Sequence, residues 1–256
     1  MSNFSPIFDD QKSAVYLEFM RITYIHHSCF LLESTSCAVL VDYWKDTRGE
    51  ADGIVHDLLE NDDRPLYVLC THFHQDHYNP EILSWKSSRV RLILSKDILR
   101  RRRPPLDAAS WMVKGGVFED EMVRVRAFGS TDSGVSYSVL MKETGQLLFH
   151  SGDMGNWRTG DDEESAVTEK RFLGELKDVR KIHPKVDAVM LPVDPRIGEY
   201  ALRGMEQFLK AVPARLVIPM HFTMGDDAIL DKAAEIFKEE PERFWRIRQS
   251  GDSILF

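Results

Sequence analysis

Residues 71–77 bring together four side chains of the types that bind metal ions. The segment reads Thr-His-Phe-His-Gln-Asp-His, and its ligand candidates follow the pattern His-x-His-x-Asp-His: His72, His74, Asp76 and His77. Neutral imidazole nitrogens and carboxylate oxygens are ligands that zinc and similar divalent cations prefer. A lone histidine is more often a surface or core residue, but packing and solubility do not explain four such residues at this spacing. The segment therefore predicts a metal site.

The residues just before this motif, 65–70, form an apolar run of strand length. The ligands should therefore emerge at the end of a buried strand, where loops usually carry chemistry. Three more residues of ligand type stand at the ends of other apolar runs: Asp42, Asp153 and His221. Gly152 allows a sharp turn just before Asp153. We expect these strand ends to meet between two sheets.

The motif resembles the signature of the metallo-β-lactamase superfamily, and the resemblance extends roughly from Arg21 to Phe222. It implies a four-layer αββα sandwich of two mixed β-sheets flanked by helices, with one or two metal ions between the sheets. It also implies six metal ligands. His72 and His74 would bind the first metal, and Asp76 and His77 the second. Asp153 would bridge both metals, and His221 would be the last histidine ligand.

Residues 24–30 and 191–194 are similar to one branch of this superfamily, which holds the L-ascorbate-6-phosphate lactonases and many uncharacterised hydrolases. In that branch a Gly-His-Ser run is usual, and its histidine lies near the metal. Here His26 replaces the glycine, and His27 takes the histidine position. The resemblance also implies that Asp42 supports the ligand loop through hydrogen bonds, which orient imidazole ligands. His27, Asp42 and Asp76 are therefore the candidate catalytic residues.

The sequence departs from the family pattern at one point. The family usually supplies another histidine between the main motif and the bridging aspartate, but residues 78–149 contain none. The matching stretch is 127–134, where Asp132 is either an oxygen ligand or a turn residue bonded to its own backbone. His27 is either a further nitrogen ligand or a substrate contact. The sequence thus leaves open whether one metal or two are bound.

Metal-dependent hydrolysis is the activity that this site predicts. A bound divalent cation lowers the pKa of its water and polarises a substrate oxygen. Zn²⁺ is the expected metal, with Mn²⁺ or iron as alternatives. Asp76 and Asp153 would hold the cations, and Asp76 could pass a proton to the leaving group. The expected substrate is a small, anionic molecule with an ester, lactone, amide or phosphodiester bond.

Two other functions remain open. One is a non-catalytic metal-binding or regulatory protein that keeps the site, which the missing histidine would permit. The other is a redox enzyme of the flavo-diiron type on the same fold, which would be expected to carry a glutamate where this chain has His74. Carboxylate-rich sites suit iron chemistry.

The remaining pattern predicts strands first and then alternating strands and helices, which is typical of two sheets flanked by helices. The helical periodicity covers residues 168–182, 198–212 and 226–238, and residues 244–247 and 253–256 are predicted to be closing strands. We expect residues 1–256 to form a single domain.

Composition excludes several classes of protein. With 256 residues, 43% hydrophobic, the chain is long enough for a full core, and no apolar run approaches the ~20 residues that span a bilayer. Residues 1–20 lack the apolar run of a signal peptide. The formal charge of −8 disfavours broad nucleic-acid binding. Three cysteines in apolar surroundings predict buried thiols, and we expect a cytoplasmic protein, with homo-oligomers not excluded.

Substrate identity depends on residues around the rim of the site. The candidates are Tyr43, Trp44, Tyr78, Trp157, Arg158, Arg196 and Tyr200. The two tryptophans could equally be packing residues, and the two arginines could pair with acidic groups. Residues 100–103 are four consecutive arginines, interpreted either as a solvated helix end or as a clamp for an anion.

Overall fold

The structure, a computed structural model, describes residues 19–47, 53–225 and 227–256, and the strands of these residues form two mixed sheets. The first sheet has seven described strands, in the order β13 (Ser253–Leu255), β1 (Arg21–His26), β2 (Cys29–Glu33), β3 (Ala38–Val41), β4 (Leu66–Cys70), β5 (Val90–Ser95) and β6 (Ser110–Met112). The second has six, in the order β12 (Ala214–Met220), β11 (Val186–Pro192), β10 (Gln146–His150), β9 (Ser136–Met141), β8 (Val123–Phe128) and β7 (Val117–Glu119).

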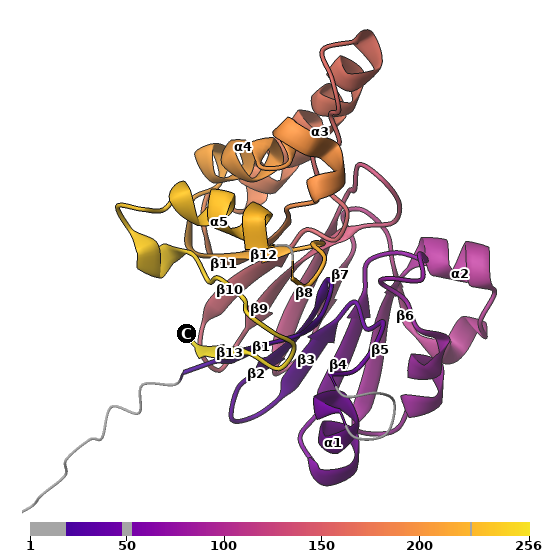
Figure 1. The fold of residues 1–256 in the computed structure, drawn as a ribbon. Helices are drawn as coiled ribbons and strands as arrows, with labels where there is room; N and C mark the ends of the chain where they lie inside the picture. The colour runs from indigo at the N-terminus through magenta and orange to yellow at the C-terminus, as the bar shows by residue number, and fades with distance from the viewer. Residues whose placement is uncertain (1–18, 48–52, 226) are drawn as a thin grey trace, which may run out of the picture.

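Helices cover the outer face of each sheet, so the predicted αββα sandwich is confirmed (Figure 1). On the first sheet lie α1 (Ile54–Asn61) and α2 (Lys96–Arg102), and on the second lie α3 (Glu163–Ile182), α4 (Arg203–Ala211) and α5 (Asp227–Glu235). Short 3₁₀ helices span Pro80–Trp85, Leu106–Ala108, Pro195–Tyr200 and Pro241–Arg243. That residues 1–256 form one domain stays a prediction.

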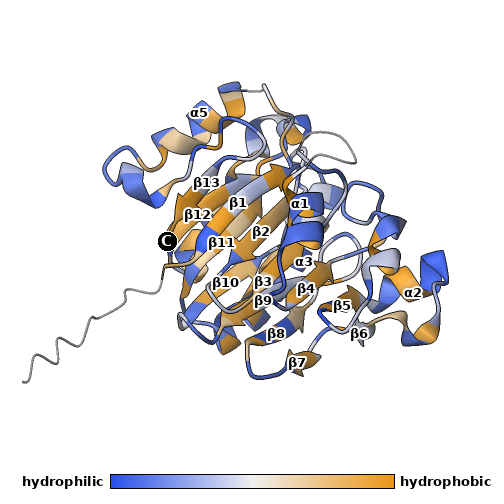
Figure 2. Cartoon of the chain, turned by 90° about the horizontal axis from the view of Figure 1, so that it is seen from below, coloured by the Kyte–Doolittle hydropathy of each residue, from blue (hydrophilic) through white to orange (hydrophobic). Residues whose placement is uncertain are grey.

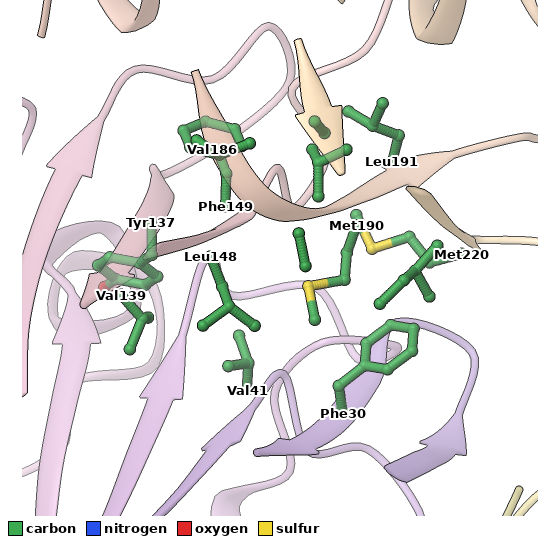
Figure 3. Close-up of a cluster of buried hydrophobic side chains, with 14 of the residues drawn as sticks. Phe30, Val41, Tyr137, Val139, Leu148, Phe149, Val186, Met190, Leu191 and Met220 are labelled. Carbon is green, nitrogen blue, oxygen red and sulfur yellow. The ribbon is translucent and has the colours of Figure 1, made fainter. Parts of the chain in front are cut away.

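The core lies between the two sheets. Hydrophobic residues concentrate on the strands (Figure 2), and inward-facing side chains of both sheets meet in the middle. Leu148 of β10 and Met190 of β11 point toward Val41 and Phe30 of the first sheet (Figure 3). A second apolar cluster fills the outer face of the first sheet, where Val55 of α1 packs. Burial of apolar surface on both faces explains the nearly continuous apolar runs of the central strands.

Two predicted elements near the C-terminus differ from the structure. The helix predicted over 198–212 is broken, because Gly198 has φ 62° and ψ −130°, which is not helical, and the α-helix begins only at Arg203. The strand predicted at 244–247 is reduced to a single bridge between Val217 and Phe244. The strand predicted at 253–256 is confirmed as β13.

Two predictions reach residues that the structure does not describe. Most of residues 1–20, where no signal peptide is predicted, lie outside the described ranges, as does residue 226 at the predicted start of the last helix. Among the described residues, no helix combines the length and apolarity needed to cross a bilayer.

Parallel pairing decides where the strands end. β3 pairs in parallel with β4, and β10, β11 and β12 are parallel neighbours in the other sheet. Because the carboxyl ends of parallel strands meet at one edge, the residues that follow them are brought together. This edge is where the candidate ligands emerge.

Candidate metal centre

The predicted ligands converge in two groups. Within each group one potential ligand atom of every residue lies within 4.8 Å of the others. The first group combines the start of the motif with residues from the second sheet: His72, His74, Asp132 and Asp153. The second combines the end of the motif with one residue after β1 and one after β12: His27, Asp76, His77 and His221. All six predicted metal ligands are therefore brought to one place.

Asp153 lies between the two groups. Its Oδ2 is 3.5 Å from Nε2 of His72, in the first group. Its Oδ1 is 3.2 Å from Nε2 of His77 and 3.5 Å from Nε2 of His221, both in the second group. One oxygen of the carboxylate thus faces each group, which is the geometry of a bridging ligand.

Asp42 fixes the orientation of the motif. This carboxylate is completely buried and accepts hydrogen bonds from the Thr71 backbone N–H (2.7 Å), the Thr71 hydroxyl (2.7 Å) and Nδ1 of His77 (2.8 Å). Since the Thr71 hydroxyl donates to Asp42, its oxygen accepts from Nδ1 of His72 at 3.0 Å. Both histidines therefore carry their proton on Nδ1 and present the lone pair of Nε2 to the centre. Asp42 positions ligands and is too deeply buried to touch a substrate.

Asp194 does the same for His221. Its Oδ2 lies 3.1 Å from Nδ1 of His221, which leaves Nε2 directed at Asp153. In the sequence, residues 191–194 stand out only as a family-like segment, which assigns Asp194 no role. The sequence does contain a signal for this role, because Asp194 is an aspartate at the end of a strand, β11, as Asp42 is at the end of β3.

His150 is a second positioning residue whose role the sequence did not reveal. Its Nδ1 accepts from the backbone N–H of Gly152 (3.1 Å), so its Nε2 donates to the carbonyl of Ser28 (2.8 Å). These bonds tie the loop of Asp153 to the loop of His27.

Asp132 and His27 each join one group, although the sequence left both open. Oδ2 of Asp132 is 3.2 Å from Nδ1 of His74, so the carboxylate faces the ligand pair where the family histidine is missing. Nε2 of His27 is 3.4 Å from Oδ2 of Asp76. The side chains of both Asp132 and His74 remain about two-fifths exposed, at 40% and 39%.

Burial and neighbouring charges shift the pKa values at the centre in opposite directions. Burial, together with the charge of His77, lowers the pKa of His72 to about 4. Burial also disfavours the charged form of His77, but the carboxylates of Asp153 and Asp42 outweigh it and raise the pKa of His77 well above its usual value. Burial opposes ionisation of Asp153, yet the charges of His77, His221 and His72 hold its pKa below the usual range.

The backbone is held in uncommon conformations at three of these positions. Among the described non-glycine residues, positive φ values occur at His27 (54°), Asp42 (55°), Arg103 (53°) and His221 (62°). Arg103 caps the end of α2, whereas the other three belong to the centre. Such conformations cost free energy and tend to persist at functional sites.

The donor set suits a metal ion. Nε2 of His77, Oδ1 of Asp153 and Nε2 of His27 are buried and have no hydrogen-bond partner among the described residues. In the neutral form of His77, with its proton on Nδ1, the lone pair of Nε2 faces a carboxylate oxygen of Asp153, and the raised pKa of His77 reflects the protonation that relieves this contact in the absence of a cation. Buried lone pairs that face one another are unfavourable. A cation between them would satisfy both, so these residues fit the metal that the motif predicts.

A pocket opens beside the second group. It has a volume of about 390 Å³, and His27, Asp76 and His221 lie in its wall. Its other walls include Tyr24, His26, Trp44, Arg196, Phe222 and Met224.

The predicted rim is only partly correct. Trp44 and Arg196 line the pocket, and the Trp157 ring lies 5.6 Å from that of His221. Tyr43 and Tyr78 are only 2% exposed, so they belong to the core behind the site. Two further rim candidates, Arg158 and Tyr200, contact the same carboxylate of Asp161 and are turned toward each other.

The four arginines at 100–103 end α2, as one of the two interpretations proposed. Their position adds a structural role, because Arg102 donates to the carbonyl of Phe73 and the guanidinium groups of Arg101 and Arg102 lie over the Phe73 ring. Phe73 stands between the ligands His72 and His74, so the end of α2 braces the motif loop.

The three cysteines are free and buried, as predicted. Cys70 also braces the motif, since its thiol lies 3.2 Å from the carbonyl oxygens of His72 and His77.

Known proteins share this sequence pattern and fold. Residues 21–167 match the family model of the beta-lactamase superfamily domain. A UPF0173 metal-dependent hydrolase of Methanosarcina barkeri is 27% identical over 242 residues, which cover 89% of this chain and 90% of that protein. A UPF0173 protein of Pyrococcus furiosus is 26% identical over 230 residues, covering 88% and 93%.

Among solved structures, Igni18, a metallo hydrolase from Ignicoccus hospitalis, matches with a TM-score of 0.62 and 17% identity. The match covers 93% of this chain and 98% of that one. CmlA, a diiron β-hydroxylase from Streptomyces venezuelae, matches with a TM-score of 0.63 and 16% identity, covering 93% and 54%. At sequence identities of 16–17%, these matches show that the fold is shared.

Proposed function

The chain belongs to the β-lactamase superfamily and is a metal-dependent hydrolase, and we propose that it hydrolyses an ester, lactone or phosphodiester bond in a small, anionic substrate. The substrate binds in the pocket beside the second ligand group. The resemblance to the ascorbate-phosphate lactonase branch stays a prediction, as do a cytoplasmic location and the formation of homo-oligomers.

One observation carries the proposal. Candidate ligands from five separate loops converge, and the two carboxylate oxygens of Asp153 face different ligand groups. A single structural metal would need only one such group. Two groups that share a carboxylate, beside an open pocket, suit a centre that binds two cations and works on a substrate.

The centre would hold two cations with different ligand sets. The first group offers two imidazoles and two carboxylates, with Asp132 in place of the missing family histidine. The second group offers three imidazoles and Asp76. Zn²⁺ suits the nitrogen-rich group, whereas the oxygen-rich group is the place for Mn²⁺ or iron if the two metals differ.

The bound cations supply a water that ionises near neutral pH and polarise the substrate oxygen. The protein positions the other participants. Asp76 lies in the pocket wall, where its carboxylate would accept a proton from the attacking water and pass it to the leaving group. Nε2 of His27 lies 3.4 Å from Oδ2 of Asp76, so the two side chains face each other at the pocket. Asp42 and Asp194 keep the ligand imidazoles in one tautomer throughout.

The first test is the substitution His72→Ala. Because Nε2 of His72 faces both His74 and Asp153, its loss should abolish turnover and lower metal content, as measured by elemental analysis and by an assay panel of lactones, esters and phosphodiesters. His183→Ala is the control, since His183 bonds Ser138 away from the centre. A His72→Ala protein that retains both properties would refute the assignment.

The same panel separates the alternative functions. A wild-type protein that binds metal but hydrolyses no member of the panel would favour the non-catalytic, regulatory alternative. Reductant-dependent dioxygen uptake would favour a redox enzyme.

A further inference from the structure

Two chemically different sets of residues line the pocket beside the metal centre. One set comes from the second ligand group and consists of Asp76, His27 and His221. Arg196 is the single lysine or arginine among the described residues that line the pocket. The other set is largely apolar and aromatic and includes Tyr24, Trp44, Phe222 and Met224. Ligand pockets of this kind use a few polar groups to orient an otherwise apolar ligand.

Asp194 orients the Arg196 side chain but occupies only some of its hydrogen-bond donors. Nε and Nη2 of Arg196 both donate to the Asp194 carboxylate, at 2.9 Å and 2.5 Å, and its backbone N–H also donates to Asp194. Asp194 in turn holds His221. The side chain is nevertheless 75% exposed, and Nη1 has no hydrogen-bond partner among the described residues. One edge of the guanidinium is thus fixed by Asp194, and the remaining edge, formed by Nη1 and Nη2 and called the outward edge, is left for a ligand.

That outward edge matches a carboxylate. A guanidinium presents its N–H groups in a planar fork that pairs with both oxygens of a carboxylate at once. The rotamer entropy that a free arginine loses on binding is reduced here, because Asp194 already holds the side chain.

Trp44 provides a flat wall for the rest of the ligand. Its ring is half-buried, with the imidazoles of His26 and His27 at 5.1 Å and 5.6 Å between ring centroids and Nζ of Lys45 at 4.3 Å from the ring centre. Because His27 also faces Asp76, a ligand body that packs on Trp44 lies next to the groups of the metal centre. An aromatic or other apolar body would gain contact area there at little cost in entropy.

We propose that the substrate is an amphipathic carboxylate, whose apolar body packs against Trp44 and whose carboxylate pairs with the outward edge of Arg196, so that its scissile bond lies over Asp76 and His221. This inference rests on the proposed function and specifies its substrate class. It also assigns specificity to Arg196 and Trp44, which lie outside the metal-ligand groups.

The test compares three probes of the metal-loaded, full-length protein by isothermal titration calorimetry: 4-phenylbutyrate, its neutral amide 4-phenylbutyramide, and acetate. We expect the acid to bind about tenfold or more tightly than the amide, because it adds a charge-assisted pair, and more tightly than acetate, because it adds the apolar body. Equal affinity for the acid and the amide would overturn the proposal.

Variants assign each part of this preference. Arg196→Gln should reduce the affinity for the acid to that for the amide and leave the amide unchanged, whereas Arg196→Lys should keep part of the preference. Trp44→Leu should weaken the binding of the acid and of the amide equally. Arg246→Gln is the control, because Arg246 pairs with Asp227 and Asp231 outside the pocket. If Arg196→Gln kept the full preference, the carboxylate would bind at the metals instead, and the proposal would be wrong.

Metal content, measured on the same samples, keeps the two proposals apart. A protein that binds no metal contradicts the proposed function, whatever the probes do. A protein that binds metal and hydrolyses esters but shows no dependence on Arg196 contradicts only the assignment of the substrate class.

Discussion

Each imidazole at the heart of the centre owes its orientation to a hydrogen bond on its other ring nitrogen. Thr71 holds His72, Asp42 holds His77 and Asp194 holds His221. In every case Nδ1 is the anchored atom and Nε2 the one that faces the centre. A chain of buried donors and acceptors therefore settles the tautomers before any cation binds, which reduces the reorganisation that binding requires.

Asp132 provides the sharpest test at the residue scale. If its carboxylate completes the first group, Asp132→Ala should lower the metal content from two ions per chain to one, and Asp132→His should restore two. Elemental analysis of dialysed protein measures this stoichiometry. Asp178→Ala is the control, because Asp178 is an exposed aspartate paired with Lys114. An Asp132→Ala protein that still holds two ions would show that Asp132 is a turn residue.

At the scale of elements, two loops from different sheets meet with almost no space between them. Gly134, with φ +65°, packs on the loop after β4, and a Cβ atom there would lie 2.1 Å from the Thr71 carbonyl oxygen and 2.7 Å from Cβ of His72. The Val135 N–H also donates to that carbonyl, at 3.0 Å. The motif can therefore take its position only because residue 134 has no side chain.

Gly134→Ala should disrupt the motif loop, because the added methyl group meets rigid backbone. We expect a loss of metal content and a lower free energy of unfolding in urea. Gly145→Ala is a matched control, since Gly145 also has positive φ (+69°), but a Cβ atom there would have no neighbouring atom within 4 Å. The control should lose only about 1 kcal/mol from backbone strain and keep its metal. Similar losses in both variants would contradict a steric role for Gly134.

His56 links α1 to the 3₁₀ helix Pro80–Trp85. Its Nδ1 lies 2.8 Å from Asp46 and its Nε2 lies 2.8 Å from Glu81. The sequence alone does not predict this bridge, because the two carboxylates come from separate segments. Burial lowers the pKa of His56, but hydrogen bonds to the two carboxylates outweigh burial and raise the pKa above 6.5.

The stabilisation by His56 should therefore depend on pH. A pKa that is higher in the folded state means that the folded protein binds more protons, so the contribution is complete below about 6.5 and is lost as the pH rises through the folded pKa. In urea unfolding from about pH 5.5 to about pH 8.5, the difference in free energy of unfolding between wild type and His56→Gln should narrow as the pH rises. A difference in free energy of unfolding that does not change with pH would mean that protonation of His56 does not stabilise the fold.

At the scale of the whole molecule, the sandwich core holds the two sheets at the separation that the centre needs. His72 and Asp42 belong to the first sheet's strand ends, while Asp153 and His221 belong to the second's. The distances from Asp153 to Nε2 of His72 (3.5 Å) and to Nε2 of His77 (3.2 Å) cross from one sheet to the other, so they depend on how the sheets pack. Figure 3 shows Leu148 in this layer, between β10 and Val41.

Leu148→Ala should lower the free energy of unfolding by about 2–5 kcal/mol, because it leaves a cavity between the sheets. Leu148 is 1% exposed, whereas Leu106, at 72%, offers a control whose change to alanine should cost no more than about 0.5 kcal/mol. Urea titrations measure both. Equal costs in the two variants would show that the sheet interface does not stabilise the fold at this position.

The sequence by itself determined the strands, the ligand motif and the residue types at the strand ends. These signals are local: apolar runs predict buried strands, and the pattern at 72–77 places four ligands within one loop. The same local logic failed at Gly198, where a single residue leaves the helical region and splits a predicted helix.

Only the tertiary structure decided how the ligands divide into two groups, that Asp132 faces His74, and that Asp194 orients His221. It also separated Arg196, which lines the pocket, from Tyr43 and Tyr78, which are core residues. The physical reason is that these contacts join loops from different strands and sheets. Their distances depend on parallel pairing and sheet packing, which no short window of sequence contains.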